Sequence, residues 1–262
     1  MSNTASKTGS GKTTIVLSAI LVLLVLFAVI VFGGIPAYRH YYVTHIRYPV
    51  YGGLTAELKD CEFYEDMHSG KSFCFLGDSI TAGNEIEGIT WYYPLIPYIK
   101  GDIYNVSRGG WRVGNLILEE DKIPVCDIYV TAIGVNDILF NYLGLSPEMP
   151  SDYTTGLDKL VNIIRSKSPN AKFYFIAPWT VHNQDDKANS RADEFRTALI
   201  NLCDEKGYIC INPDPVLSSV LKKTGIKDYM KDNFHPNASN GVGLYSYAVL
   251  KSDHDRKAVS QK

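Results

Sequence analysis

The chain has 262 residues and a formal net charge of −2 at neutral pH. This length allows one sizeable α/β domain with a short appendage, and the near-neutral charge argues against nucleic acid as a partner. Its five cysteines form neither a CxxC pair nor a Cys/His cluster with zinc-ligand spacing, so no metal site is predicted. An odd number of cysteines also argues against a full disulfide framework, although Cys203 and Cys210 could pair outside a cell.

The N-terminal segment predicts a disordered cytoplasmic tail followed by a transmembrane helix. Residues 1–14 are rich in Ser, Thr and Gly and have little to bury. They contain GSGKTT, but Ser6 stands where a P-loop requires glycine and no strand precedes the motif, so nucleotide binding is not predicted. Residues 15–34 contain no charged side chain. At about 1.5 Å per residue, this segment would span roughly 30 Å as a helix, which is the thickness of a bilayer core.

A cleaved signal peptide is the alternative for the same segment. Lys7 and Lys12 would form its basic region, and residues 35–37 loosely resemble a cleavage site. Signal peptides usually have only about 7–15 apolar residues, which favours an anchor. Arg39 and Arg47 balance the two lysines, so charge does not set the orientation. Because a short tail without acidic residues stays inside easily, we expect a single-pass membrane protein with its folded domain outside the cytoplasm.

The rest of the chain divides into a juxtamembrane segment (35–70), a folded domain (71–251) and a polar tail (252–262). In the first of these, aromatic side chains are candidate anchors at the membrane–water interface: Tyr38, Tyr41 and Tyr42. The domain contains five short runs rich in β-branched and aromatic residues, which predict buried parallel strands: 72–77, 102–106, 127–134, 172–177 and 208–212.

Helical patterns lie between these predicted strands. One covers residues 153–165 and another covers 191–203, and a final helix is expected to begin near Ala238. In the first pattern, four apolar residues form one stripe: Leu157, Leu160, Val161 and Ile164. Repeated β-α-β units predict a doubly wound, flavodoxin-like parallel sheet of five strands in a three-layer α/β/α arrangement. Functional residues are then expected in loops at the carboxyl ends of the strands.

Polar residues with catalytic potential follow the predicted strands. Ser79 follows the first strand in GDSIT, although a Gly-Asp-Ser turn is also ordinary loop chemistry. DNFHP near the C-terminus places Asp232 and His235 three residues apart. A serine hydroxyl needs a base to take its proton, and a carboxylate must orient the imidazole. These three residues therefore predict nucleophilic catalysis.

Two further residues are candidate donors for an oxyanion. Gly110 follows the second strand and Asn136 the third. A glycine lets its N–H approach a substrate closely, and asparagine donates through an amide that does not titrate. Each also has a purely structural interpretation: Gly110 could form a simple turn, and Asn136 could cap a helix.

Four motifs in order resemble the blocks of SGNH (GDSL-like) hydrolases: GDSIT (77–81), NVSRGG (105–110), GVND (134–137) and DNFH (232–235). The resemblance implies a serine esterase without a cofactor. It assigns the nucleophile and first oxyanion donor to Ser79, the other donors to Gly110 and Asn136, and the rest of the triad to His235 and Asp232. GDSI replaces the commoner GDSL, and Ser107 and Arg108 differ from the usual second block. The rival base is His182, in a loop near Asp185 and Asp186.

The resulting prediction is hydrolysis of short acyl esters, above all acetyl, on a cell-envelope or exported carbohydrate. The aromatic rings of Trp111 and Trp179 follow strands and are predicted to bind sugar rings, whereas Trp91 could equally belong to the core. Water and a sugar are both possible acyl acceptors, so an O-acetyltransferase acting on a polysaccharide stays open. A lipase or thioesterase and a non-catalytic binding module are the remaining alternatives.

Overall fold

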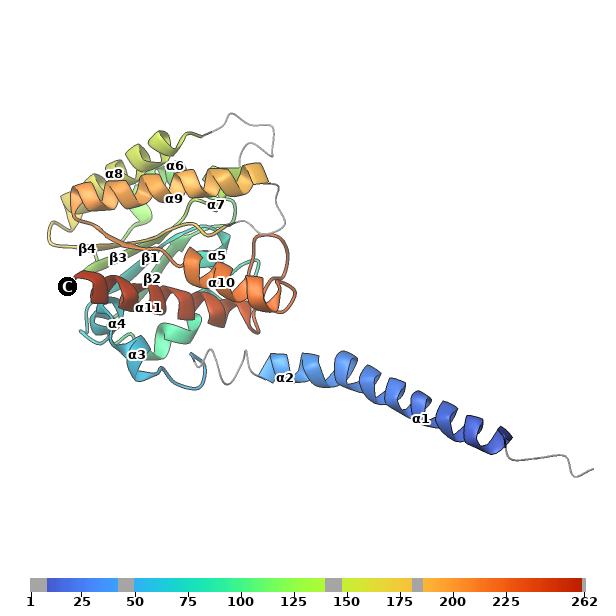
Figure 1. The fold of residues 1–262 in the computed structure, drawn as a ribbon. Helices are drawn as coiled ribbons and strands as arrows, with labels where there is room; N and C mark the ends of the chain where they lie inside the picture. Colours follow the sequence, from blue (N-terminus) through green and yellow to red (C-terminus); the bar gives the residue numbers. More distant parts are fainter. Residues whose placement is uncertain (1–8, 42–49, 140–147, 181–185, 261–262) are drawn as a thin grey trace, which may run out of the picture. The chain divides into compact units, whose positions relative to one another are not determined.

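The computed structural model describes residues 9–41, 50–139, 148–180 and 186–260. The chain separates into two compact units, Met1–Arg47 and Tyr48–Lys262, which are described in turn (Figure 1).

The first unit is helical throughout its described residues. It consists of α1 (Gly9–Val29), a π-helical turn (Ile30–Gly34) and α2 (Ile35–Tyr41). The prediction that residues 1–14 lack structure is therefore wrong for positions 9–14, because adding residues to an existing helix costs little. The stretch Ile15–Tyr38 is long and apolar enough to cross a membrane and is not buried, although a signal sequence meets the same criterion. Tyr42 lies outside the described residues.

The second unit contains the predicted parallel sheet, with strand order β2-β1-β3-β4-β5. The five strands match the five predicted runs: β1 (Phe73–Gly77), β2 (Ile103–Ser107), β3 (Ile128–Ala132), β4 (Lys172–Ile176) and β5 (Ile209–Ile211). β1 lies between β2 and β3, with Gly77 in register with Ser107 on one side and Ala132 on the other. The loops after these three strands therefore start at the same level of the sheet.

Helices cover both faces of the sheet (Figure 1). One face carries α6 (Val113–Leu118), α8 (Pro150–Lys167) and α9 (Asp186–Lys206), and the other carries α3 (Ala56–Lys59), α4 (Glu62–Met67), α10 (Asp214–Thr224) and α11 (Gly241–Ser260). Two short helices follow strands at the carboxyl edge: α5 (Ser79–Ala82) and α7 (Val135–Leu139). Single 3₁₀ segments occupy Tyr93–Tyr98 and Glu120–Lys122. The doubly wound α/β architecture is thus confirmed.

The predicted domain limits at 71 and 251 differ from the structure. Phe63 on α4 is fully buried, and its N–H donates to Asp253 Oδ2 on α11 at 2.7 Å. Arg256 on α11 pairs with Glu62 on α4 at 2.6 Å. These contacts join the supposed juxtamembrane segment and the supposed polar tail to the catalytic unit. The last helix begins at Gly241, because Asn237 Oδ1 accepts the N–H of Gly241 at 2.9 Å and caps the helix.

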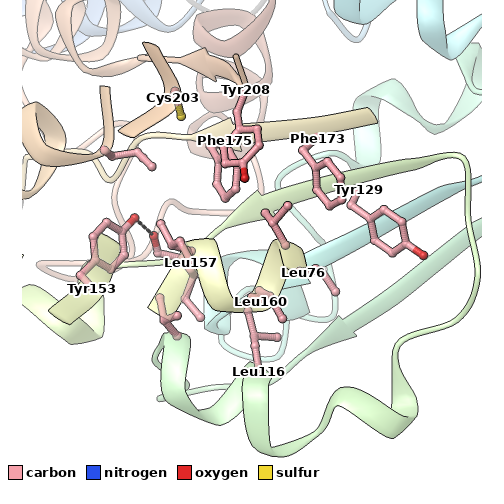
Figure 2. Close-up of a cluster of buried hydrophobic side chains, with 14 of the residues drawn as sticks. Leu76, Leu116, Tyr129, Tyr153, Leu157, Leu160, Phe173, Phe175, Cys203 and Tyr208 are labelled. Atoms are coloured by element: carbon pink, nitrogen blue, oxygen red, sulfur yellow. Dashed lines mark hydrogen bonds between the residues drawn. The ribbon is translucent and has the colours of Figure 1, made fainter. Parts of the chain in front are cut away.

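The core on the α6–α8–α9 face is a continuous cluster of apolar side chains from the strands and these three helices (Figure 2). The predicted stripe on α8 is buried at all four positions: Leu157, Leu160, Val161 and Ile164. Tyr153 also enters this cluster and donates its hydroxyl to the backbone oxygen of Ile133 at 3.0 Å. The opposite face is packed largely with aromatic rings, and Trp91 is fully buried among them, in contact with Phe75 and Tyr245.

Candidate active site

Ser79 is the first residue of α5, directly after the turn that ends β1. A Cβ atom at Gly77 would collide with Thr81 and with the backbone oxygen of Ala132, so the tight turn requires glycine there. Asp78 caps α5, because its Oδ1 accepts the N–H of Ile80 at 3.0 Å. The turn and the cap together hold the Ser79 side chain at the carboxyl edge of the central strand.

His235 and Asp232 lie on the loop before α11, and the structure brings both to Ser79. The Ser79 Oγ atom lies 2.8 Å from His235 Nε2, and His235 Nδ1 lies 2.8 Å from Asp232 Oδ2. A carboxylate can only accept at this site, so Nδ1 carries the proton and Nε2 is left to accept from the serine hydroxyl. The three side chains therefore form one hydrogen-bonded chain.

The loop geometry fixes the Asp232 carboxylate. Its Oδ1 accepts the backbone N–H groups of Phe234 and His235, both at 2.8 Å. Burial raises the pKa of Asp232, but these N–H groups and the His235 ring lower it more strongly, so the net shift is downward. Asp232 is consequently a carboxylate at neutral pH and holds the His235 ring in the orientation that faces Ser79.

Gly110 and Asn136, the two predicted oxyanion donors, both line the same cavity as Ser79. Gly110 has a φ of +77°, a conformation that favours glycine, in the loop after β2. Asn136 lies in α7, and its Nδ2 atom donates to the backbone oxygen of Trp111 at 3.0 Å. This bond ties α7 to the loop that carries Gly110.

The cavity has a volume of about 290 Å³, at the lower end of the range of roughly 300–1,000 Å³ for small-molecule sites. Four of its lining residues were predicted from the sequence, and six were not. The unpredicted ones are mostly apolar or backbone contributions: Ile80, Glu85, Gly109, Val135, Leu139 and Phe234. Sequence patterns gave no signal for them, since only the fold decides which way such side chains point.

The predicted sugar-binding tryptophans do not line this cavity. Trp179 is 2% exposed and its ring packs edge-on against Tyr245, so the prediction that it presents a flat face to a substrate is wrong. Trp111 is half-buried and packs against the α6–α8–α9 core. Trp91 lies in the core. His182 and Asp185 are outside the described residues, as is the side chain of Asp186.

Two buried acids next to the site were not predicted. Asp78 is 2% exposed, and burial raises its pKa to about 6. Asp137 is fully buried, and its pKa is raised well above the ordinary value, mainly by burial and to a smaller extent by the negative charge of the neighbouring Glu148. Asp137 Oδ1 accepts the N–H of Val113 and so joins α7 to α6. Within the described ranges, no group of three or more His, Cys, Asp or Glu side chains could hold a metal ion.

The sequence of this unit matches a known family. The model of the GDSL-like Lipase/Acylhydrolase family covers residues 75–239, more than half of the chain. The chain belongs to this family. It is therefore a hydrolase of the GDSL-like, or SGNH, type, as its four motifs predicted. A search of curated proteins gave no match.

Solved structures share the fold at low sequence identity. The acetylxylan esterase Axe2 from Geobacillus stearothermophilus is 18% identical with a TM-score of 0.62, over 71% of this chain and 95% of that chain. LAE5, an α/β-hydrolase enzyme from the metagenome of Lake Arreo in Spain, is 19% identical with a TM-score of 0.58, over 71% of this chain and 97% of that chain. These similarities show that the chain shares its α/β fold with both enzymes.

Proposed function

We propose that the chain is a serine esterase that hydrolyses short acyl esters through an acyl-enzyme on Ser79. The observation that carries the proposal is the hydrogen-bonded chain from Ser79 Oγ through both His235 nitrogens to Asp232. A serine hydroxyl becomes an effective nucleophile only when a base is within hydrogen-bonding distance and is itself oriented. Both conditions hold here, and Ser79 and His235 line a cavity of substrate size.

The reaction follows from this arrangement. His235 Nε2 takes the Ser79 proton while Oγ attacks the ester carbon, and the carbonyl oxygen becomes negatively charged. The imidazolium, stabilised by Asp232, then protonates the departing alcohol and leaves the acyl group on Ser79. In the second half, His235 takes a proton from water while the water oxygen attacks the acyl carbon. The bond to Ser79 Oγ then breaks, the imidazolium returns its proton to Oγ, and the acid leaves.

The developing oxyanion needs donors that are already in place. The backbone N–H groups of Ser79 and Gly110 and the side-chain amide of Asn136 are our candidates, because all three residues line the cavity. One N–H of the Asn136 amide is bonded to Trp111. An amide nitrogen carries two hydrogens, so the second remains for the substrate oxygen.

The sequence predicts acetyl groups on a cell-envelope or exported carbohydrate as the natural substrate. The similarity to an acetylxylan esterase supports this candidate. The prediction that Trp179 binds a sugar ring no longer supports it, because this ring is buried. The apolar N-terminal helix supports a single-pass anchor, and the short tail without acidic residues is the reason to propose that the catalytic unit lies outside the cytoplasm. An acetyltransferase would use the same residues, and adding oligosaccharides during ester cleavage distinguishes the two: new acetylated sugar indicates transfer, and free acetate alone indicates hydrolysis.

Substitution of the three side chains tests the central proposal. Ser79→Ala and His235→Ala should each abolish cleavage of a chromogenic ester, and Ser79→Ala should also prevent covalent labelling by a fluorophosphonate. The matched control is Ser107→Ala, which removes a serine at the end of β2 that is not part of the hydrogen-bonded chain. Retention of full activity in either Ser79→Ala or His235→Ala would disprove the mechanism.

A further inference from the structure

A second groove, separate from the active-site cavity, lies at the N-terminal end of the catalytic unit. It has a volume of about 490 Å³ and is formed by residues 50–53 and by the 3₁₀ segment Tyr93–Tyr98. Three of its side chains are exposed: Tyr51 (49%), Tyr93 (53%) and Ile96 (37%). Eight large apolar side chains are exposed among the described residues of this unit, so three of the eight gather in one groove. Scattered exposed apolar residues need no explanation, but a contiguous group marks an interaction surface.

Contacts within the catalytic unit fix the shape of this groove. The Tyr51 ring packs on α11, because a Cβ atom at Gly243 would lie 2.7 Å from its Cε2 atom. The N–H of Leu54 donates to the Tyr98 hydroxyl at 3.3 Å and joins the entering chain to the 3₁₀ segment. Burial, and to a smaller extent the neighbouring Tyr93, raises the pKa of Tyr51, so its hydroxyl stays protonated at neutral pH. The groove therefore presents ordered, uncharged rings.

The length and charge of the preceding segment connect this groove to a membrane. Under the proposed single-pass anchor, the apolar stretch ends at Tyr38, and Tyr51 follows thirteen positions later. A fully extended segment of that length spans at most about 45 Å. Arg39 and Arg47 lie between these two tyrosines, and no acidic residue precedes Glu57 in the sequence. Anionic lipid headgroups attract a basic segment of this kind beside a membrane span.

The composition of the groove suits the boundary between the headgroups and the acyl chains of a bilayer. Tyrosine is enriched at this boundary because its ring is apolar and its hydroxyl is polar. Among the described residues that line the groove, none is charged. We propose that Tyr51, Tyr93 and Ile96 dock on this boundary of the bilayer that holds the N-terminal helix. The inference rests on the proposed membrane anchor and adds a second membrane contact to it.

Docking orients the active site relative to the membrane. The Tyr51 hydroxyl donates to the backbone oxygen of Ala238 at 3.5 Å, on the loop that carries His235 three positions earlier. A docked groove therefore holds this loop close to the membrane surface, where acylated groups attached to the membrane reach the cavity. Weak binding suffices, because a short linker gives an effective concentration in the millimolar range. A dissociation constant of about 1 mM then keeps the groove docked for roughly half of the time.

The fluorescence of a tryptophan placed in the groove tests the proposal. The full chain with Tyr93→Trp is reconstituted in vesicles of phosphatidylcholine and phosphatidylglycerol, either unmodified or with bromine on the acyl chains near the headgroups. Bromine quenches tryptophan only at short range, so the emission added at position 93 should fall by roughly half in the brominated vesicles. The matched control is Leu118→Trp, since this leucine is 83% exposed on α6, across the sheet from α11, and should lose no emission.

A second substitution shows whether the apolar side chains cause the quenching. Ile96→Ser, added to Tyr93→Trp, should restore most of the emission because membrane binding depends on the buried apolar area, and an unchanged Tm shows that the variant is folded. Equal emission in both kinds of vesicle, or equal quenching at positions 93 and 118, would overturn the inference. Shielding of position 93 from iodide without quenching by bromine, in a protein that cross-links as a dimer, would also overturn it, because a second copy would then cover the groove. A chain that does not float with the vesicles would refute the proposed anchor itself, and the docking with it.

Discussion

Replacement of Asp78 by asparagine should make the protein more stable at neutral pH and leave its stability unchanged under acidic conditions. Asp78 is 2% exposed between β1 and α5, and its Oδ1 accepts the N–H of Ile80. Burial raises its pKa to about 6, while the Ile80 N–H and the nearby His235 act in the opposite direction. Asparagine has almost the same shape and keeps the oxygen that caps α5, but it cannot ionise.

The magnitude follows from proton linkage. The unfolded chain loses the Asp78 proton near pH 3.9 and the folded protein near pH 6, so the folded state binds more protons between these values. The free energy of unfolding therefore falls as the pH rises through this window. Two pKa units correspond to about 3 kcal/mol that the wild type has lost above the folded pKa. Asp78→Asn should be more stable than the wild type by up to this amount at neutral pH.

Thermal unfolding of the full chain in detergent, followed by tryptophan fluorescence, measures the effect. All three tryptophans lie in the Tyr48–Lys262 unit and report on its unfolding. An increase of up to about 3 kcal/mol raises Tm by roughly 6–12 °C for a domain of this size. The control Glu194→Gln removes an exposed carboxylate on α9 and should not shift Tm. A Tm difference that is the same near pH 4 and near pH 7.5 would show that the buried carboxylate does not cause the instability.

Three further substitutions test other parts of the molecule. Asp232→Asn keeps an acceptor for the N–H groups of Phe234 and His235 but loses the charge, so kcat should fall about 10⁴-fold, less than the roughly 10⁶-fold expected for Ser79→Ala. In Gly110→Ala the added Cβ meets no atom within 4 Å, but alanine disfavours the φ of +77° at this position. The free energy of unfolding should fall by about 1 kcal/mol in a denaturant titration. Displacement of the Gly110 N–H should lower kcat by up to about 100-fold. Leu157→Ala should cost about 3–5 kcal/mol in the same titration, because this side chain is completely buried.

The fold could be predicted because parallel strands that are buried on both faces form continuous apolar runs. All residues of β1 and β3 are buried, as their sequences indicated. The limits of the catalytic unit could not be predicted in this way. Residues 56–67 form short helices with several charged side chains, and their place in the unit depends on α11, about 190 positions away. No local pattern contains such a contact.

The candidate site was predictable to the extent that its chemistry is local in sequence. Asp232 and His235 are three residues apart, and each proposed oxyanion residue follows a strand. The direction in which a loop side chain points is not local. Trp179 follows β4 as predicted, but its large apolar ring is favoured in the interior, where it packs against Tyr245. Phe234 was missed because the direction of its side chain, toward the cavity, likewise depends on the fold and not on the local sequence.

The N-terminal helix should anchor the enzyme in a membrane, with the catalytic unit on the outer side. Within Ile15–Tyr38 the apolar side chains are largely exposed, and such a surface suits the hydrocarbon core of a bilayer. The protein should therefore remain in the membrane pellet after carbonate washing, and protease added to intact cells should degrade the catalytic unit. Replacing both Leu23 and Leu24 by arginine adds about 6–8 kcal/mol to the insertion free energy and should shift the protein to the soluble fraction. Protection from protease until the cells are permeabilised would reverse the orientation, and a soluble wild-type product that begins near Tyr38 would identify the helix as a cleaved signal.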